Sequence, residues 1–560
     1  MATVTVNGQP VQIGDNEKLN CVQVAQRAGT EIPHYCFHPQ LSVVASCRMC
    51  LVEIGETKPD GTVAMQPKLF PGCQTPVKDG MVVVSNSPKV EAAQKATLEY
   101  LLLNHPLDCP VCDQAGECGL QDYSYEYGRG YSRLDEPKNI KPDKDYIGNH
   151  VTLFTDRCIM CTRCVRFTRE ISGTSELQII HRGSSEEIDI FPGEPLNNKL
   201  SGNVVDLCPV GALCSKDFLY EQRVWWLKRK NSVCNGCSNN CGIHIDQNND
   251  TLYRVTPRPN QHAQAGGHFI CDDGRLGWKY VHSENRLKTP KAPSGASDWG
   301  SVIGQLRQEL ATAAANAPKR VAALISPYAT VEEAYLLASF LKGLSPDIRL
   351  GLSPYRVEGE DDQYPKDLHG EVREPVRFTI KAEKCPNRQG VTAVLEHFQG
   401  ELLEAPVVLS AAEQGELDVL FVLGGDPQGT LNSADIARLA NVKTVIVQDL
   451  LASELTERAN YLLAGSAWAE RDGTFINFKG LAQQIRRALR GPDDCWQDGR
   501  ILSELAGRRG LFHAPTVRQE IASQIPALSS LGVGELGDDG LFLQDPAAAT
   551  GEPQLAGSAQ

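Results

Sequence analysis

Long apolar runs are missing from this 560-residue chain, and no window approaches the roughly 18 uninterrupted apolar residues that a membrane-spanning helix requires. The first residues, MATVTVNGQPVQIGDN, also lack the apolar core of a signal peptide and the arginine-rich pattern of a transit peptide. We therefore expect the protein to stay where it is made and not to insert directly into a membrane. Any membrane association is expected to go through another subunit.

Positive charge is also scarce, because 55 Lys and Arg residues stand against 69 Asp and Glu residues, a formal net charge of −14. This balance argues against nucleic-acid binding and against a polybasic membrane anchor. The one basic, tryptophan-containing stretch, YEQRVWWLKRKNS at residues 220–232, is interpreted as a helical linker with a solvated face. Proteins or small molecules are the expected partners.

Catalytic signatures are absent as well, since no nucleophile and base stand out as a pair and no nucleotide-binding loop is recognisable. The segment GVGELG at residues 532–537 matches GxGxxG, but it has no strand before it and no helix after it. The region from about 525 to 560 is rich in Gly, Ala, Ser and Pro and is predicted to be disordered. We expect no catalytic residues in this chain and place the substrate chemistry elsewhere.

Cysteine, in contrast, is abundant, with nineteen residues of which seventeen lie between Cys21 and Cys271. In a chain without an export signal this usage indicates metal or redox sites rather than disulfides. Fifteen of these cysteines and one histidine fall into four groups with metal-ligand spacing. The chain therefore divides into two halves with different chemistry.

The first group has the spacing C-x10-C-x2-C-x22-C and consists of Cys36, Cys47, Cys50 and Cys73. Four thiolates suit a 2Fe-2S cluster, although plant-type ferredoxins have only four residues between the first two ligands. Zinc held by four thiolates is the alternative. The flanking sequence predicts a hairpin turning at Asn7-Gly8, a helix ending at Gly29, and strands over LVEIG and MVVVS.

The second group follows a helix predicted over residues 87–104 and has the spacing H-x3-C-x2-C-x5-C. Its members are His105, Cys109, Cys112 and Cys118. Three thiolates and an imidazole suit a structural zinc or a 4Fe-4S cluster, and the neighbouring groups favour the cluster. An imidazole in place of a thiolate removes one negative charge and raises the potential of such a cluster.

The third group is the most specific, because CIMCTRC is followed after 43 residues by a Cys-Pro pair, as in the bacterial 4Fe-4S run. Its members are Cys158, Cys161, Cys164 and Cys208. Arg163, between two of these ligands, is either a charge that stabilises the reduced cluster or a surface residue. Cys214 is left over and is interpreted as a buried free thiol, with a second, degenerate half-site as the alternative.

The fourth group has the spacing C-x2-C-x3-C-x29-C and consists of Cys234, Cys237, Cys241 and Cys271. Zinc ribbons share this spacing, but the presence of the three other groups in the same chain favours a 4Fe-4S cluster. The following GIHIDQNNDTLYRV predicts a hairpin. From about residue 300, apolar strand-like runs such as LDVLFVLGGDP alternate with helical patterns, which predicts a parallel-sheet α/β domain.

In this order the four groups resemble those of the large iron-sulfur subunit of bacterial respiratory NADH:quinone oxidoreductase, complex I, from Thr3 to about residue 490. The resemblance implies one 2Fe-2S cluster on the first group and three 4Fe-4S clusters on the others. It also implies a peripheral subunit on the cytoplasmic side of the bacterial inner membrane. Such a subunit relays electrons from a flavin-bearing NADH subunit to cluster-bearing subunits on the way to quinone.

The segment AERDGTFINFKG is similar to a signature of molybdopterin oxidoreductases, E-x2-G-T-x2-N-x2-G, at Glu470, Gly473, Thr474, Asn477 and Gly480. Two departures argue against a working molybdenum site. Where those enzymes carry C-x-K-G, this chain has Asp273 in place of the lysine, and its C-terminal region is far shorter than a complete pterin-binding domain. We interpret this part as a scaffold that has lost its cofactor, and we expect no molybdopterin.

The predicted fold class is multidomain α+β and α/β. The segments are a β-grasp, ferredoxin-like 2Fe-2S domain over 1–85, a histidine-plus-three-cysteine 4Fe-4S domain over 86–145, a bacterial-ferredoxin-like 4Fe-4S domain over 146–225, a 4Fe-4S domain of the molybdopterin-enzyme type over 230–286, a degenerate molybdopterin-oxidoreductase-like α/β domain over 300–524, and the tail over 525–560.

Three alternatives remain open on the sequence. The chain also fits an iron-sulfur subunit of a related hydrogenase, a molybdenum formate dehydrogenase subunit, or a scaffold with four zinc sites. An iron-only hydrogenase needs further cysteines in its catalytic domain, and beyond Cys271 only Cys385 and Cys495 remain. Cys385 is the one remaining candidate for a molybdenum ligand, and Cys21 is interpreted as a small buried hydrophobe.

Overall fold

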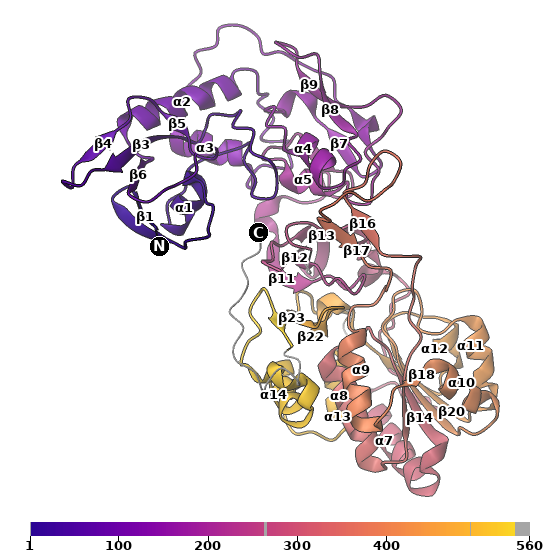
Figure 1. The fold of residues 1–560 in the computed structure, drawn as a ribbon. Coiled ribbons are helices and arrows are strands. Elements are labelled where there is room, and N and C mark those ends of the chain that lie inside the picture. The colour runs from indigo at the N-terminus through magenta and orange to yellow at the C-terminus, as the bar shows by residue number, and fades with distance from the viewer. Residues whose placement is uncertain (1, 263–265, 493, 544–560) are drawn as a thin grey trace. The chain divides into compact units, whose positions relative to one another are not determined.

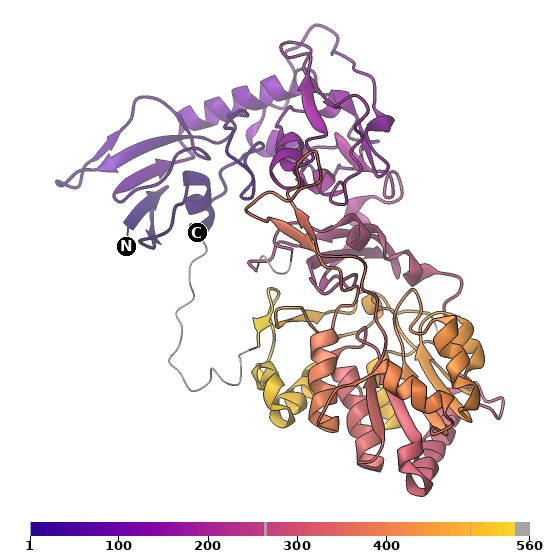
Figure 2. The ribbon, with the colours of Figure 1, turned by 45° about the vertical axis from the view of Figure 1, so that its right-hand side comes forward.

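A computed structural model describes residues 2–262, 266–492 and 494–543. The chain forms two compact units (Figures 1 and 2). Of the described residues, the first unit holds those up to Leu227 together with Tyr364–Arg377, and the second holds those of Lys228–Gln363 and those that follow from Phe378. Within the described ranges, no helix combines the length and the apolar character needed to cross a membrane.

The first unit begins with a mixed sheet in the order β2-β1-β6-β3-β4, with β5 paired to β3. Strand β1 is antiparallel to β2 and parallel to β6. The predicted turn is confirmed, because Asn7 and Gly8 both have positive φ. The elements are β1 (Ala2–Val6), β2 (Gln9–Ile13), α1 (Cys21–Arg27), β3 (Leu51–Thr57), β4 (Val63–Met65), β5 (Phe70–Pro71) and β6 (Met81–Val84).

Helix α1 begins four residues later than the start of the predicted segment, because Asn20 forms a capping box with Gln23 and fixes the first turn. Its buried face, with Cys21 and Val24, packs against Val4 and Val83 of the sheet in one apolar core. The sequence predicted the hairpin, the helix and the two strands of this part, so the sheet that carries the first group is confirmed.

The rest of the first unit is built from short elements joined by loops. Ser87 accepts a hydrogen bond from the Val90 amide and caps the helix predicted over residues 87–104. The elements are α2 (Pro88–Leu102), α3 (Gly119–Tyr127), η1 (Asp145–Ile147), β7 (Val151–Leu153), η2 (Thr155–Arg157), α4 (Arg163–Glu170), β8 (Leu177–Ile180), β9 (Glu187–Ile190), α5 (Asn203–Leu207), β10 (Leu213–Ser215) and η3 (Val224–Trp226).

A loop from the C-terminal half of the chain completes the first unit, which the sequence did not predict. It lies between β16 (Asp362–Tyr364) and β17 (Phe378–Ile380), which pair as a two-stranded ribbon. In this loop the Lys366 amide donates to the Ser172 carbonyl at 2.9 Å. Arg377 donates to the Gln40 carbonyl at 3.1 Å.

The second unit starts with an antiparallel sheet of β11 (Lys228–Val233), β12 (Gly242–Asn248) and β13 (Thr251–Pro257). The predicted hairpin of β12 and β13 is confirmed, with Asn249 and Asp250 at positive φ in its turn. The helical linker predicted over residues 220–232 is wrong. Its second half is strand β11, which pairs with β12 along its whole length, and its first half holds only the short η3.

The predicted parallel sheet is confirmed, and Figure 1 labels three of its strands, β14, β18 and β20. Its strand order is β18-β15-β14-β19-β20-β21. Numbered along the sheet-forming strands alone this is 3-2-1-4-5-6, the doubly wound order, with its switch point between β14 and β19. The strands are β14 (Val321–Ile325), β15 (Arg349–Leu352), β18 (Leu403–Glu404), β19 (Val419–Leu423), β20 (Thr444–Asp449) and β21 (Tyr461–Ala464).

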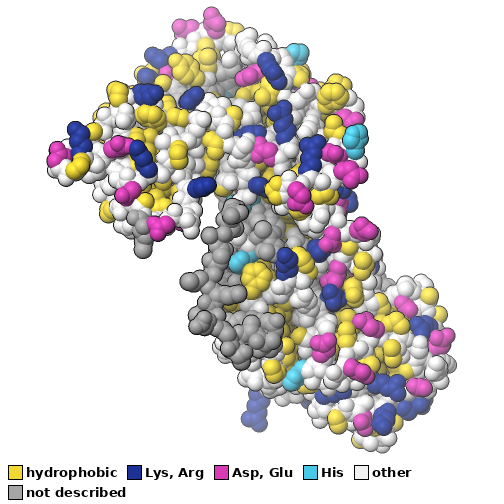
Figure 3. Space-filling model, viewed as in Figure 1, with side chains coloured by type: hydrophobic (Ala, Val, Ile, Leu, Met, Phe, Trp, Pro, Cys, Tyr) yellow, Lys and Arg dark blue, Asp and Glu magenta, His cyan; other side chains and the backbone are white. Residues whose placement is uncertain are grey.

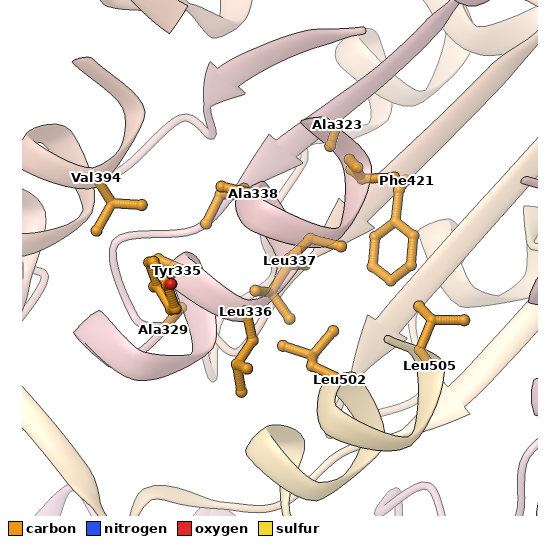
Figure 4. Close-up of a cluster of buried hydrophobic side chains, with 14 of the residues drawn as sticks. Ala323, Ala329, Tyr335, Leu336, Leu337, Ala338, Val394, Phe421, Leu502 and Leu505 are labelled. Atoms are coloured by element: carbon orange, nitrogen blue, oxygen red, sulfur yellow. The ribbon is translucent and has the colours of Figure 1, made fainter. Parts of the chain in front are cut away.

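Helices cover both faces of this sheet. One face packs against α7 (Trp299–Asn316), α8 (Val331–Leu344), α9 (Arg388–Gln399), α13 (Asp498–Leu505) and α14 (Ala514–Gln524). Figure 4 shows this core where Leu336 and Leu337 approach Leu502 of α13 and Phe421 of β19. The other face packs against α10 (Ala405–Glu413), α11 (Ser433–Ala437) and α12 (Glu454–Arg458). These two cores bury alternate side chains of the central strands β14 and β19.

The remaining elements are α6 (Asp272–Leu276), η5 (Lys279–His282), η6 (Pro318–Arg320), η7 (Arg438–Asn441), η8 (Trp468–Glu470), β22 (Gly473–Ile476), β23 (Leu481–Ile485), η9 (Pro526–Gly532) and β24 (Leu541–Phe542). The disorder predicted over 525–560 is wrong for its first part, because η9 buries Leu528 and Leu531 and β24 pairs with β23. The rest of that prediction, residues 544–560, lies outside the described residues.

Charged side chains of both signs are interspersed over the face seen in Figure 3. A mixed surface of this kind fits the acidic but not extreme net charge of the chain, −14.

Candidate iron-sulfur sites

The pairing of β3 with β5 brings the first group together. Cys50 directly precedes β3 and Cys73 follows β5, and the Gly72 amide donates to the Cys50 carbonyl at 2.8 Å. The thiols of Cys47 and Cys73 form hydrogen bonds with Cys36, which lower the pKa of Cys36, and Cys73 acts on Cys50 in the same way. The four predicted ligands therefore meet at one place.

The second group lies on the loop between α2 and α3. Cys109 is exposed, whereas Cys112 and Cys118 are buried. The amides of Val111 and Cys112 both donate to the Asp108 carbonyl at 2.8 Å, so the Cys109–Cys112 segment is a tight turn. Cys118 interacts electrostatically with Cys112 and Cys109.

His105 is half-buried, and its Nδ1 atom is buried and forms no hydrogen bond with any residue that the structure describes. Burial, with the charges of Lys138 and Arg157, lowers the pKa of His105 to about 4. The imidazole is therefore neutral near pH 7, which is the form that binds metal. His105 and Cys112 both have Arg157 as a charged neighbour.

A pocket marks the third group. All four predicted ligands line it, and most of its other lining residues are apolar. The lining consists of Leu153, Cys158, Ile159, Cys161, Thr162, Cys164, Ile188, Cys208, Val210, Ala212 and Leu213. Met160 and Thr162 take left-handed backbone conformations that turn the short loop around its cysteines, and Cys208 directly follows α5. An apolar pocket with four converging thiols fits the donor set of an iron-sulfur cluster.

The second and third groups share the turn after Cys208. The Gly119 amide donates to the Pro209 carbonyl at 3.2 Å. A Cβ atom at Gly211 would collide with the Cys112 sulfur, so a larger residue there would displace that thiol. Sequence reasoning missed Gly211, since a single glycine beside a Cys-Pro pair has no distinctive signal.

In the fourth group, a Cβ atom at Gly274 would lie 3.0 Å from the Cys234 sulfur and 3.6 Å from that of Cys271. These two thiols therefore face the same point. Cys241 interacts electrostatically with Cys234, Cys237 and Cys271, so the group converges. Asp273, which replaces the lysine of the molybdenum enzymes, adds negative charge and raises the pKa of Cys234, where burial has the larger effect.

Polar N–H groups point at several of these sulfurs. The amides of Met160, Gly236 and Gly274 each donate at 3.4 Å, to Cys158, Cys234 and Cys271 respectively. The Asn239 side chain donates to Cys241 at 3.3 Å. Such bonds stabilise negative charge on sulfur and tune the potential of a bound cluster.

Among the described residues, no set of three or more His, Cys, Asp and Glu side chains is arranged to hold a single metal ion. The assignment of the sixteen side chains as cluster ligands therefore stays a prediction, supported by the convergence of the cysteines within each group.

The signature residues of the second unit form hydrogen bonds within the protein. Glu470 makes a buried, two-bond ion pair with Arg286 at 2.7 and 2.9 Å. The Thr474 hydroxyl donates to Glu332 at 2.7 Å, and Asn477 donates to the Asn239 carbonyl beside Cys241 at 3.4 Å. These residues link the fourth group to the α/β sheet.

A carboxylate on β20 lies beside the switch point between β14 and β19, where doubly wound proteins bind ligands. Asp449 ends β20 and accepts hydrogen bonds from the amides of Gly425 at 3.1 Å and Leu450 at 2.8 Å. A Cβ atom at Gly424 would lie 2.4 Å from its Oδ2 atom. Backbone amides in a glycine turn suit a phosphate group. Here the Gly425 amide already donates to the Asp449 side chain.

Replacing Asp449 by asparagine should flatten the pH dependence of the stability of the second unit. Burial raises the pKa of Asp449 to about 7 from its ordinary value of 3.8. Between these two pH values the folded state holds a proton that the unfolded state has lost, so stability falls as pH rises from about 4 to 7. Asparagine removes this contribution while its side-chain oxygen still accepts both amide bonds.

Pulse proteolysis in urea between pH 5.5 and 8 measures this effect on the full chain. Asp347→Asn is the control, because Asp347 is exposed. Equal slopes for the wild type and Asp449→Asn would contradict the prediction.

The remaining cysteines contact protein groups. Cys214 is buried and donates to the Gly211 carbonyl at 3.6 Å. Cys21 is fully buried in the first core, as predicted. Cys385 is also fully buried, beside Glu383 and Arg388, and the Cys495 thiol donates to the Gly465 carbonyl at 2.8 Å.

Five family models match the chain, and they follow one another along it. They are the 2Fe-2S iron-sulfur cluster binding domain at residues 1–88, the NADH-ubiquinone oxidoreductase-G iron-sulfur binding region at 94–133, the ferredoxin-like domain of NADH-quinone oxidoreductase subunit 3 at 148–214, the molybdopterin oxidoreductase Fe4S4 domain at 227–283, and molybdopterin oxidoreductase at 397–508.

A solved structure described as an NAD+-reducing NiFe-hydrogenase in the H2-reduced state is 26% identical and covers 40% of this chain and 91% of its own, with a TM-score of 0.35.

The names of similar proteins agree with the family models. The chain is 34% identical to the G subunit of NADH-quinone oxidoreductase from Rickettsia bellii over 64% of this chain and 50% of the relative. The values for Rickettsia felis are 32%, 72% and 58%. The NADH-ubiquinone oxidoreductase 75 kDa subunit of Reclinomonas americana is 41% identical over 52% of this chain and 40% of the relative. The chain thus spans about half the length of these relatives. By these matches the chain is similar to the NADH-quinone oxidoreductase G subunit and to the NADH-ubiquinone oxidoreductase 75 kDa subunit.

Proposed function

We propose that the chain is the iron-sulfur electron-transfer subunit of the peripheral arm of respiratory NADH:quinone oxidoreductase. The first group holds a 2Fe-2S cluster, and the second, third and fourth groups hold one 4Fe-4S cluster each. The observation that carries this proposal is the pocket between Cys158, Cys161, Cys164 and Cys208. The names of the relatives and the order of the family models support the same function.

When bound, iron-sulfur clusters accept and donate single electrons. The residues of the chain fix where this happens and at what potential. Apolar side chains such as Leu153 and Ile188 exclude water from the third group, and the Met160 amide places a positive dipole on the sulfur of Cys158. The neutral imidazole of His105 contributes no negative charge to its group, which favours electron uptake there.

The partners that we propose are the flavin-bearing NADH subunit as electron donor and cluster-bearing subunits of the quinone module as acceptors. In this assembly the chain lies at the periphery, on the cytoplasmic side of the bacterial inner membrane. Nucleic acid has no place in this function, and membrane attachment comes through the other subunits.

The α/β part of the second unit acts as a scaffold without molybdopterin. The Asp449 carboxylate supports this proposal because it occupies the glycine turn at the switch point. Asp273 supports it as well, since a carboxylate replaces the lysine between the cluster and the pterin.

Anaerobic purification followed by metal analysis tests the function. One 2Fe-2S and three 4Fe-4S clusters require about fourteen iron and about fourteen acid-labile sulfide per chain. We expect a brown protein with electron paramagnetic resonance (EPR) signals on reduction with dithionite, and no stoichiometric molybdenum. A colourless chain with about four zinc ions would contradict the proposal. Stoichiometric molybdenum would favour a formate dehydrogenase subunit instead.

A further inference from the structure

Helix α4 turns one face toward the loop that follows Cys36. Arg163, Arg166 and Glu170 are spaced three and four residues apart and therefore lie on the same side of the helix. Glu170 accepts hydrogen bonds from the amide and hydroxyl of Ser42 at 2.8 and 2.5 Å. The first turn of the same helix carries Cys164, a predicted ligand of the third group.

Arg166 contacts a ligand residue of each of two groups. Its Nη2 atom donates to the Cys36 carbonyl at 2.5 Å and to the Cys161 carbonyl at 3.3 Å. Its Nη1 atom donates to the carbonyl of Ser42. The side chain is buried, with 7% of the residue exposed. One guanidinium thus joins the backbone of the first group to that of the third.

Arg163 makes a second connection of the same kind. It donates to the Phe37 carbonyl at 2.5 Å and to the Leu207 carbonyl at 3.3 Å. Phe37 follows Cys36, and Leu207 precedes Cys208. Its charge interacts with the thiols of both groups, so it is not a surface residue, the second interpretation that the sequence left open.

These contacts suit arginine and no other residue. The guanidinium is planar, always charged, and has five donors in a fixed fork, so it can bind carbonyls from two segments at once. A lysine would keep the charge and lose the fork. Burial among carbonyl oxygens also keeps the positive charge in a low dielectric, where it acts strongly on nearby groups.

We propose that Arg166, assisted by Arg163, is a positioning residue that holds the first and third groups in fixed register and places a shared positive charge between them. This inference rests on the proposed function, because the charge can favour reduction only if both groups hold clusters. It predicts that one side chain sets two potentials together. Removing the Arg166 side chain should disfavour the reduced form of both groups, because an added electron is no longer attracted by its positive charge.

The experiment compares Arg166→Gln, Arg166→Lys and Arg169→Gln in the anaerobically purified full chain. Arg169 is the matched control, since it is an exposed arginine on the same helix. EPR-monitored redox titration gives the midpoint potentials. Hydrogen exchange of residues 37–42 measures the clamp, by which we mean the hydrogen bonds from Arg166 to the carbonyls of Cys36 and Ser42. We expect Arg166→Gln to lower the midpoint potentials of the first and third groups, leave that of the fourth unchanged, and speed exchange in 37–42.

Arg166→Lys should speed the same exchange with a smaller shift of the two potentials, because it keeps the charge without the fork. The proposal is overturned if Arg166→Gln gives the potentials and exchange rates of Arg169→Gln. If Arg166→Gln does not accumulate, Arg166→Lys decides, since unchanged exchange in 37–42 would refute the clamp. Missing signals in the wild-type chain would instead refute the proposed function, and exchange would still test the clamp.

Discussion

Replacing Cys208 by alanine should remove one of the three 4Fe-4S signals and about four iron atoms per chain. Cys208 lines the pocket of the third group with three other thiols, and a cluster with one ligand missing is no longer held on all four irons. Because metal binding is coupled to folding in small units, the segment over 146–225 should also become sensitive to proteolysis. EPR, iron analysis and limited proteolysis measure the three effects.

Cys214 offers the matched control six residues later in the chain. It is buried, its thiol donates to the Gly211 carbonyl, and it is not among the residues that line the pocket. Cys214→Ala should keep all four signals and the full iron content. If Cys214→Ala lost the third-group signal while Cys208→Ala kept it, the ligand assignment of this group would be wrong.

The elements predicted well are those with local causes. The Asn7-Gly8 turn, the Ser87 cap and the hairpin at Asn249 follow from residues that favour their conformation within a few positions. The ligand groups were also readable, because cysteines close together in sequence need only a short loop to converge. The more distant members, Cys73 and Cys208, were identified by their spacing and join their groups through strand pairing and α5.

The failures have non-local causes. Residues 228–233 carry Lys-Arg-Lys, which favours a solvated helix, yet they form a strand because β12 offers a partner with full register. The loop at 364–377 joins the first unit through contacts with Ser172 and Gln40, far away in sequence. Arg166 was missed for the same reason, since its partners are backbone carbonyls up to 130 residues away and carbonyls carry no sequence signal.

Replacing Arg471 by methionine should destabilise the second unit by about 3–5 kcal/mol, because it leaves buried carboxylates without their cation. Arg471 lies 3.1 Å from Glu333 and 3.1 Å from Asp498, and it donates to the Tyr328 carbonyl at 2.9 Å. Glu333 is fully buried and Asp498 nearly so. Methionine fills a similar volume, so the loss of stability comes from the missing positive charge rather than from a cavity.

The dependence of this loss on pH identifies its cause. Burial raises the pKa of Glu333 to about 7 from 4.5, and Arg471 holds it lower than it would otherwise be. In Arg471→Met the folded-state pKa rises further, so the added penalty applies mainly above pH 7, where the unfolded state is fully ionised. Urea unfolding by pulse proteolysis should therefore show a larger loss of stability at pH 8 than at pH 6.

Arg438→Met is the control, because it breaks the pair between Arg438 and the exposed Glu413. This change should cost about 0–1 kcal/mol at either pH. Equal losses for the two variants would show that the buried pair contributes no more than the surface one, and adding Glu333→Gln to Arg471→Met should recover part of the loss.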